Sequence, residues 1–219
     1  FTCNTNSNNV KIKMMDKSKT VILGSGVSGI GAVKLAQKKG LDIFLSDSKN
    51  IKSETKKLLS KLEVIYEEHG HTENLIKDSN EIIISPGIDL RSLIKSKPSL
   101  KKKKIISEVE FASRYTNAFI IAVTGTNGKT TTSKLIYHIL KNSGFNVGLA
   151  GNIGYSFSES IVENQFDYYV LEVSSFQLDH IINFRPDISI ITNISPDHLD
   201  RYDNKLESYA EAKFNICLL

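Results

Sequence analysis

Short apolar runs recur along the chain, and most are followed by a polar turn and then by apolar residues at helical spacing. The clearest runs lie at 19–23, 41–45, 81–84, 119–123 and 166–173. Buried parallel strands read as continuous apolar runs, whereas amphipathic helices repeat every three or four residues. The pattern predicts an α/β protein in which parallel strands alternate with helices.

Weaker segments between these runs complete the pattern. In the first half we predict helices at 52–62, 74–77 and 90–95 and strands at 64–66 and 105–106. In the second half we predict strands at 146–149 and 187–194, the latter buried, and a helix at 204–217. A helix at 108–115 links the two halves.

The order of these elements divides the chain into two units. We predict a Rossmann-like parallel-sheet domain over residues 17–107 and a P-loop-type α/β domain over residues 108–219. Residues 1–16 are rich in Asn, Ser and Thr and lack periodicity, which predicts a disordered tail. The lysine run at 101–104 is expected to be a solvated connector, with anion binding as the alternative.

Composition narrows the class of protein. The net charge is +4, and only four of the 28 basic residues are Arg, which disfavours the bidentate base readout of nucleic-acid-binding proteins. No apolar run approaches the roughly 20 residues of a membrane span, and no leader pattern opens the chain. Cys3 and Cys217 lack metal-ligand spacing. We expect a cytoplasmic monomer with no nucleic-acid or membrane partner.

A glycine-rich turn follows the apolar run at 119–123. It reads Gly-Thr-Asn-Gly-Lys-Thr-Thr-Thr from Gly125 to Thr132, and a helical pattern comes next. This is the layout of a phosphate-binding loop, in which Lys129 neutralises phosphates and Thr130 reaches Mg²⁺. The glycine spacing is short, because Val123 stands where the usual pattern has its first glycine. The alternative is a turn that only caps a helix.

A second glycine turn lies near the start of the chain. Gly24–Gly29 forms a G-x-G-x-x-G between a predicted strand and helix, and Asp47 follows the next strand. This arrangement is typical of dinucleotide-binding units, in which the acidic residue contacts a ribose. A tight turn without a ligand is the alternative.

Four polar residues come directly after strands of the second unit: Lys129, Asn152, Glu172 and His198. Parallel strands end at one edge of their sheet, so we expect these side chains to converge. A lysine for phosphates and a carboxylate for Mg²⁺ suit phosphoryl transfer. The alternatives are that Glu172 is a structural ion-pair partner and that His198 is a surface loop residue.

Together these motifs resemble the Mur ligases, the amide-forming enzymes of peptidoglycan precursor synthesis. In the second unit the similarity runs through residues 124–131, 151–154, 172–178 and 193–202. In the first unit the family's uridine-diphosphate domain is similar at residues 24–29, 47–48 and 85–88. Within the family, Ser-Ser-Phe-Gln-Leu at 174–178 resembles the branch that adds D-glutamate.

The resemblance implies a role for each motif residue. ATP would bind Gly125, Thr126, Asn127, Gly128, Lys129, Thr130, Thr131 and Thr132. Mg²⁺ would be held by Thr130, Glu172, His198 and Lys213, the last as a carbamate that requires a partly buried, unprotonated amine. The nucleotide-linked substrate would contact Val27, Ser28, Asp47, Gly87, Asn152, Ser174 and Gln177. The catalytic residues would be Lys129, Asn152 and His198. Without the resemblance, Lys213 would be read as a solvated helix lysine.

The implied reaction is ATP-dependent addition of D-glutamate to UDP-N-acetylmuramoyl-L-alanine through an acyl phosphate. The family has a third domain, and this chain ends within the second. We therefore expect a fragment or a truncated ligase, with an incomplete central domain and no C-terminal domain, that shows no turnover alone. The alternatives are a non-catalytic nucleotide-binding module and, less favoured, a nicotinamide-dependent oxidoreductase, which leaves residues 125–131 unexplained.

Overall fold

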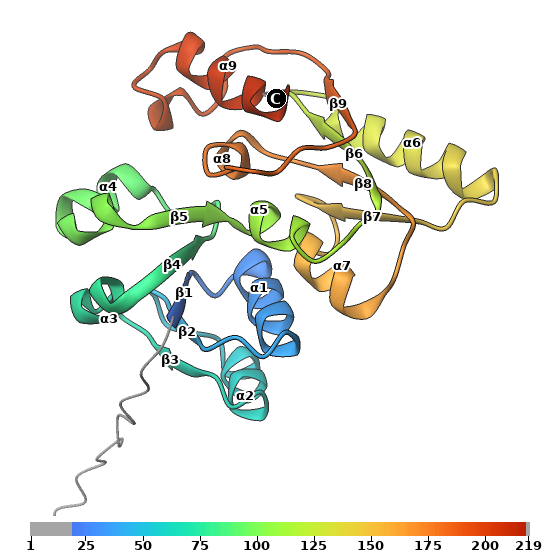
Figure 1. Ribbon diagram of the computed structural model, residues 1–219. Helices are drawn as coiled ribbons and strands as arrows, with labels where there is room; N and C mark the ends of the chain where they lie inside the picture. The colour runs from blue at the N-terminus through green and yellow to red at the C-terminus, as the bar shows by residue number, and fades with distance from the viewer. Residues whose placement is uncertain (1–18, 218–219) are drawn as a thin grey trace, which may run out of the picture.

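Two parallel β-sheets, one in each half of the chain, form the framework of the protein (Figure 1). The computed structural model describes residues 19–217, so the predicted tail at 1–16 lies outside the described residues. Helices connect the successive strands of both sheets. The predicted α/β class, with a Rossmann-like sheet followed by a P-loop-type unit, is confirmed.

The first sheet has the strand order β3-β2-β1-β4-β5, and every pair is parallel. This is the order of a Rossmann-type sheet. Its strands are β1 (Lys19–Leu23), β2 (Ile43–Ser46), β3 (Ile65–Glu67), β4 (Ser79–Ile84) and β5 (Lys104–Ser107). Its helices are α1 (Val27–Lys38), α2 (Ser53–Lys61), α3 (Glu73–Asp78) and α4 (Leu90–Ser96), with a 3₁₀ turn η1 at Pro98–Lys102.

The second sheet has the order β7-β8-β6-β9, again with parallel pairs. Its strands are β6 (Phe119–Thr124), β7 (Val147–Gly151), β8 (Tyr168–Glu172) and β9 (Ile188–Ile191). The short helix α5 (Glu108–Ser113) joins the two halves. The remaining helices are α6 (Lys129–Asn142), α7 (Phe157–Glu163), α8 (Ser175–Leu178) and α9 (Leu206–Phe214), with 3₁₀ turns η2 (Leu199–Arg201) and η3 (Asn215–Cys217).

A continuous hydrophobic core connects the two halves. Helices α1, α5 and α7 meet between the sheets (Figure 1), and Val33, Phe111 and Phe157 from these helices are each at most 1% exposed within one cluster. Each such side chain contributes about 1.5–3 kcal/mol by leaving water. The halves are therefore held together by packing as well as by the chain that links them.

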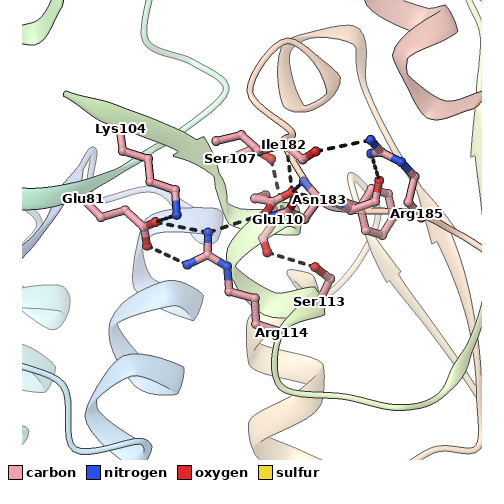
Figure 2. A network of polar contacts seen from close by, with 10 residues as sticks. Glu81, Lys104, Ser107, Glu110, Ser113, Arg114, Ile182, Asn183 and Arg185 are labelled. Carbon is pink, nitrogen blue, oxygen red and sulfur yellow. Dashed lines mark hydrogen bonds and ion pairs between the residues drawn. The ribbon is translucent and has the colours of Figure 1, made fainter. Parts of the chain in front are cut away.

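A polar network at α5 adds a second connection (Figure 2). The buried carboxylate of Glu110 accepts three backbone N–H groups, from Ile182, Asn183 and Phe184, at 2.7–2.9 Å. Arg114, which caps the C-terminal end of α5, makes a bidentate pair with Glu81 of β4 at 2.7 and 3.1 Å. A buried carboxylate is tolerated when several donors satisfy it. The network thus fixes α5 against both halves.

Two expectations need correction, and two helices were missed. The strand at 187–194 was expected to be buried, but β9 lies at the edge of the described sheet, and Ile188 is 44% exposed. The lysine run is only partly a solvated connector, because Lys103 donates to two backbone carbonyls and Lys104 of β5 pairs with Glu81 at 2.9 Å. Helices α7 and α8 were not predicted at all.

Among residues 19–217, no helix combines the length and the apolar content that crossing a bilayer requires.

Candidate functional site

The turn between β6 and α6 has the backbone shape of a phosphate-binding loop. Gly125 and Gly128 both have positive φ, +140° and +81°, which L side chains rarely adopt. A side chain at Gly125 would also meet the Thr192 hydroxyl at 2.0 Å. Helix α6 begins at Lys129, so its N-terminal N–H groups surround the turn. The sequence prediction of a strand, a glycine turn and a helix is confirmed here.

The Lys129 side chain curls over this turn. Its amine donates to the carbonyls of Gly125 at 2.9 Å and Thr126 at 2.7 Å. The ammonium group is therefore held directly above the backbone that would cradle a polyphosphate. If a phosphate bound there, the Lys129 amine would replace its two contacts with neutral carbonyls by a contact with an anion.

Two predicted ATP-binding residues are tied to the neighbouring segment instead. The Thr126 hydroxyl contacts the Ser195 backbone at 3.0–3.1 Å and the Tyr209 hydroxyl at 3.2 Å. Asn127 exchanges backbone hydrogen bonds with the Asn193 side chain. These contacts anchor the loop to the segment after β9. Thr131 and Thr132 follow in the first turn of α6.

Glu172 lies at the carboxyl end of β8 and is only 3% exposed. It accepts hydrogen bonds from the Thr130 hydroxyl at 2.7 Å and the Asn152 amide at 3.0 Å. Both donors are neutral, and no ion pair involves Glu172 among the described residues. A buried carboxylate in this setting is costly unless a cation offsets it.

Mg²⁺ fits this arrangement. The ion prefers oxygen ligands and is commonly bound by one or two carboxylates together with substrate phosphates and waters. Thr130 and Glu172 would supply a hydroxyl and a carboxylate beside the phosphate loop. No group of three His, Cys, Asp or Glu side chains gathers within residues 19–217, so phosphate oxygens would have to complete such a site.

A cavity of about 340 Å³ brings all three predicted catalytic residues together with two predicted ligand residues. Lys129, Asn152, Ser174, His198 and Lys213 all line it. They come from the start of α6, from the segments that follow β7, β8 and β9, and from α9. The convergence expected from the strand ends is therefore present.

Lys213 is buried in this cavity wall, with 2% of its surface exposed. Its amine donates to the Gly125 carbonyl at 2.9 Å and lies 4.5 Å from the centroid of the Tyr209 ring. Burial, reinforced by the nearby charge of Lys129, lowers the pKa of Lys213 to about 8. About a tenth of this amine is thus unprotonated at pH 7, far more than for a solvated lysine with a pKa near 10.4.

His198 and Gln177, two further residues of the predicted site, differ in their exposure to solvent. His198 has a left-handed backbone (φ +51°) and a half-exposed side chain, and its ring is 5.3 Å from that of Phe176. Gln177 is buried, and its side-chain oxygen accepts from the N–H and hydroxyl of Ser174 in a capping box at the start of α8. Gln177 therefore positions Ser174 and does not line the cavity.

A larger cavity, of about 600 Å³, lies over the first glycine turn. Four predicted substrate residues line it: Val27, Ser28, Asp47 and Gly87. Gly29 allows the tight approach of α1 to β1, since a side chain there would meet the Gly24 carbonyl at 1.9 Å. This cavity sits at the carboxyl ends of the strands, where ligands bind in open α/β sheets.

Asp47 is fixed against the glycine turn. One carboxylate oxygen accepts from the Ser25 N–H at 2.7 Å and the Ser25 hydroxyl at 2.6 Å, and the other accepts from the Lys49 N–H. Burial alone would raise the pKa of Asp47, but these hydrogen bonds lower it overall, so the carboxylate stays ionised.

Sequence reasoning missed several residues of both cavities. His71 lines the larger cavity with its Nδ1 2.6 Å from the Ser46 hydroxyl, and burial lowers its pKa. Phe176 and Arg201 line the smaller one. His71 carried no recognisable local pattern, and Phe176 lay within the 174–178 motif without an assigned role. Arg201 stood within the 193–202 motif, but only contacts between the halves reveal its position.

Two family models match the chain. The model of the Mur ligase middle domain matches residues 123–218, and that of the MurD N-terminal domain matches residues 19–94. Together these ranges include every residue named above as lining either cavity, although β5 lies outside both. The chain belongs to the Mur ligase family. The resemblance that was drawn from the sequence motifs is thereby confirmed.

Curated relatives place the chain within the Mur ligases in more detail. It is 50% identical over 198 residues to a protein of Bacteroides thetaiotaomicron and 49% identical over 204 residues to one of Porphyromonas gingivalis. Both are named UDP-N-acetylmuramoylalanine–D-glutamate ligase. The alignments cover 90% and 92% of this chain but 45% of each relative. The chain thus spans less than half the length of these Mur ligases.

A solved Mur ligase structure shares the fold. The UDP-N-acetylmuramate–alanine ligase of Thermotoga maritima is 23% identical, with a TM-score of 0.54. The superposition covers 91% of this chain and 47% of that one.

Proposed function

We propose that this chain forms the substrate-activating part of an ATP-dependent ligase that joins D-glutamate to UDP-N-acetylmuramoyl-L-alanine. We assign the nucleotide-linked substrate to the unit at 17–107 and ATP with Mg²⁺ to the unit at 108–219. The names of the relatives support this choice of substrates. A cytoplasmic location and a monomeric state belong to the same proposal.

One observation carries the proposal. Pro86 and Gly87, in the loop after β4, line both the 600 Å³ cavity and the 340 Å³ cavity. A substrate whose nucleotide rests over the first glycine turn can therefore extend past Gly87 toward Lys129. Two cavities that share a wall provide the geometry for bringing a carboxylate to a bound triphosphate.

The chemistry follows from the weak electrophilicity of a carboxylate. A carboxylate oxygen of the nucleotide-linked substrate attacks the γ-phosphorus, and the bond to the β–γ bridging oxygen breaks, which releases ADP. The amine of D-glutamate then adds to the acyl phosphate carbon, and inorganic phosphate leaves as the amide forms. Lys129 would offset the repulsion between carboxylate and triphosphate, and Asn152 and His198 would orient the reacting groups.

Mg²⁺, when bound, would supply further neutralisation of the phosphate charge. Thr130, Glu172 and His198 are the residues that would hold it. Lys213 completes this set as a carbamate, because its neutral amine can add to CO₂ and lose a proton to give an anion. Its burial and its pKa of about 8 support that assignment.

Titration calorimetry on the 219-residue chain tests the binding half of the proposal. We expect binding of UDP-N-acetylmuramoyl-L-alanine, and binding of ATP that depends on Mg²⁺. UDP-N-acetylmuramate, which lacks the alanine carboxylate, is the matched control for the substrate. Binding of NADH without any response to the UDP-linked substrate would instead support the oxidoreductase alternative.

A chimera tests the chemical half. The part of the Bacteroides thetaiotaomicron relative that follows the aligned region is joined after residue 217. We expect phosphate release that requires ATP, the UDP-linked substrate and D-glutamate together. If both ligands bind and a folded chimera releases no phosphate, the chain is a non-catalytic nucleotide-binding module.

A further inference from the structure

One side chain, Arg201 at the end of η2, connects the loop that the two cavities share to the second half. Its guanidinium donates to the Ile88 carbonyl at 2.9 Å and lies 3.9 Å from the Asp89 carboxylate. Both partners belong to the segment after β4, directly beyond Pro86 and Gly87. Arg201 itself is about a quarter exposed and lines the smaller cavity.

On its other side Arg201 rests on an aromatic cluster. The guanidinium carbon lies 4.6 Å from the centroid of the Phe176 ring. Phe176 in turn stacks on Tyr202, with ring centroids 5.9 Å apart and planes at 4°, and its ring is 5.3 Å from that of His198. Three contacts, from Ile88 to Arg201, from Arg201 to Phe176 and from Phe176 to His198, therefore connect the 86–89 loop to His198.

We propose that Arg201 is a positioning residue that couples the nucleotide-linked substrate cavity to the ATP cavity. A substrate that orders the 86–89 loop favours the Arg201 contact with Ile88, and that contact holds Phe176 and His198 in place beside the phosphate loop. Filling either cavity then strengthens binding in the other, as thermodynamic linkage requires. This inference rests on the proposed function, because both ligands are those of the ligase.

The chemistry of the contact needs an arginine. A planar guanidinium can donate at its edge and stack on an aromatic ring through its face at the same time. A lysine ammonium has no flat face, and its three donors cannot reproduce both contacts in one geometry. Arg201→Lys keeps the charge and the long apolar stem, so it isolates the geometry of the contact from the charge.

The same two segments contain a matched control. Arg91 pairs with Asp203 at 2.7 Å, and both side chains are more than half exposed. Exposed pairs of this kind contribute little. Arg91 also touches no aromatic ring among the cation–π contacts of the described residues. Arg91→Ala therefore removes a cross-segment ion pair without touching the aromatic route to His198.

The experiment measures ATP·Mg²⁺ affinity of the 219-residue chain with and without saturating UDP-N-acetylmuramoyl-L-alanine. In the unaltered chain we expect the substrate to strengthen ATP binding about tenfold, within the usual range of coupling between sites. In Arg201→Ala and Arg201→Lys the ratio falls to about one. Arg91→Ala keeps the full ratio.

The outcomes separate this inference from the proposed function. If both ligands bind the unaltered chain independently, or if Arg201→Lys keeps the tenfold ratio, Arg201 does not couple the cavities and the ligase assignment stands. If the unaltered chain binds neither ligand, both proposals are wrong. A purely structural role for Arg201 would lower the melting temperature and weaken both ligands equally, and would leave the ratio unchanged.

Discussion

The two halves of the molecule begin with the same unit, a strand, a glycine turn and a helix, but they anchor the neighbouring carboxylate differently. In the first half Asp47, directly after the adjacent strand β2, accepts hydrogen bonds from the backbone N–H and hydroxyl of Ser25 in the turn. In the second half Glu172 lies on the adjacent strand β8. Its hydrogen-bond donors are not in the turn but are Thr130 on α6 and Asn152.

This difference changes what each turn can bind. Asp47 has its charge offset by hydrogen bonds from the protein itself, and its pKa is lowered accordingly. Glu172 has only neutral side-chain donors, and Lys129 stands over the turn beside it. The first site is complete without a cation and suits the hydroxyls and amide groups of a nucleoside. The second has a carboxylate and a lysine, the groups that our proposal assigns to Mg²⁺ and phosphates.

The largest expected effect tests whether both turns depend on glycine for the same reason. Gly29→Ala places a methyl group 1.9 Å from the Gly24 carbonyl, and Gly125→Ala places one 2.0 Å from the Thr192 hydroxyl. We expect each to lower the free energy of unfolding by about 3 kcal/mol or more, because backbone or a packed side chain must shift. Urea unfolding monitored by circular dichroism measures this.

The control is Gly26, another glycine of the first turn. A side chain at Gly26 would meet nothing within 4 Å, and its φ of −75° suits any residue. Gly26→Ala should therefore change stability by less than about 1 kcal/mol. If it destabilises the protein as much as Gly29→Ala does, the close approach of α1 to β1 is not the reason for the glycine.

Lys129→Met tests the difference in phosphate binding between the two turns. We expect ATP·Mg²⁺ affinity to fall about 100-fold, the effect of losing a charge-assisted contact in a partly buried site. Affinity for the UDP-linked substrate should stay within twofold, because its cavity contains no part of α6. Calorimetric titration measures both, and Lys134→Met, on the exposed side of α6, serves as the matched control.

The two carboxylates should respond in opposite ways to loss of charge. Glu172→Gln should weaken Mg²⁺-dependent ATP binding about tenfold and leave stability without Mg²⁺ unchanged or higher, since a buried charge is removed. Asp47→Asn should weaken the UDP-linked substrate about tenfold and lower stability by about 1 kcal/mol, since Ser25 loses an ionised acceptor. Equal effects of Mg²⁺ on both variants would contradict the comparison.

Lys213 gives the smallest effect, in the pH dependence of stability. Its pKa is lowered from 10.5 to about 8, so between these values the unfolded chain holds a proton that the folded chain lacks. The free energy of unfolding should therefore rise with pH, by about 1 kcal/mol from pH 8 to pH 9 in CO₂-free buffer. Lys213→Met should flatten this slope.

Addition of ¹³C-bicarbonate to the same samples provides a separate reading. We expect a carbamate ¹³C resonance from the unaltered chain that is missing from Lys213→Met. An identical spectrum from both proteins would contradict carbamate formation at Lys213.

The periodic segments were predictable because local patterns determine them. The strands and helices of the first sheet and the phosphate loop all appear where the sequence indicated. Helix α7 was missed because seven residues hold too little apolar periodicity. Ser156 and Glu159 at its start do form a capping pattern that gives a usable signal.

Burial and long-range partners could not be predicted in the same way. The apolar residues of β9 indicate a buried strand, but its edge position depends on sheet order, which no local pattern records. Similarly, the burial of Lys213 comes from the way α9 packs against the phosphate loop. The contact of Arg201 with Ile88 joins residues 113 positions apart. These features arise only when the two halves meet.

Glu110 also determines how the chain could be divided. A cut between α5 and β6 would leave its carboxylate on one piece and the three amide groups of residues 182–184 on the other. Each piece alone would expose a charged group or unpaired amides together with part of the shared apolar core. The pieces are therefore suited to reassembly as a split protein, and recovery of ATP binding on mixing them would report their association.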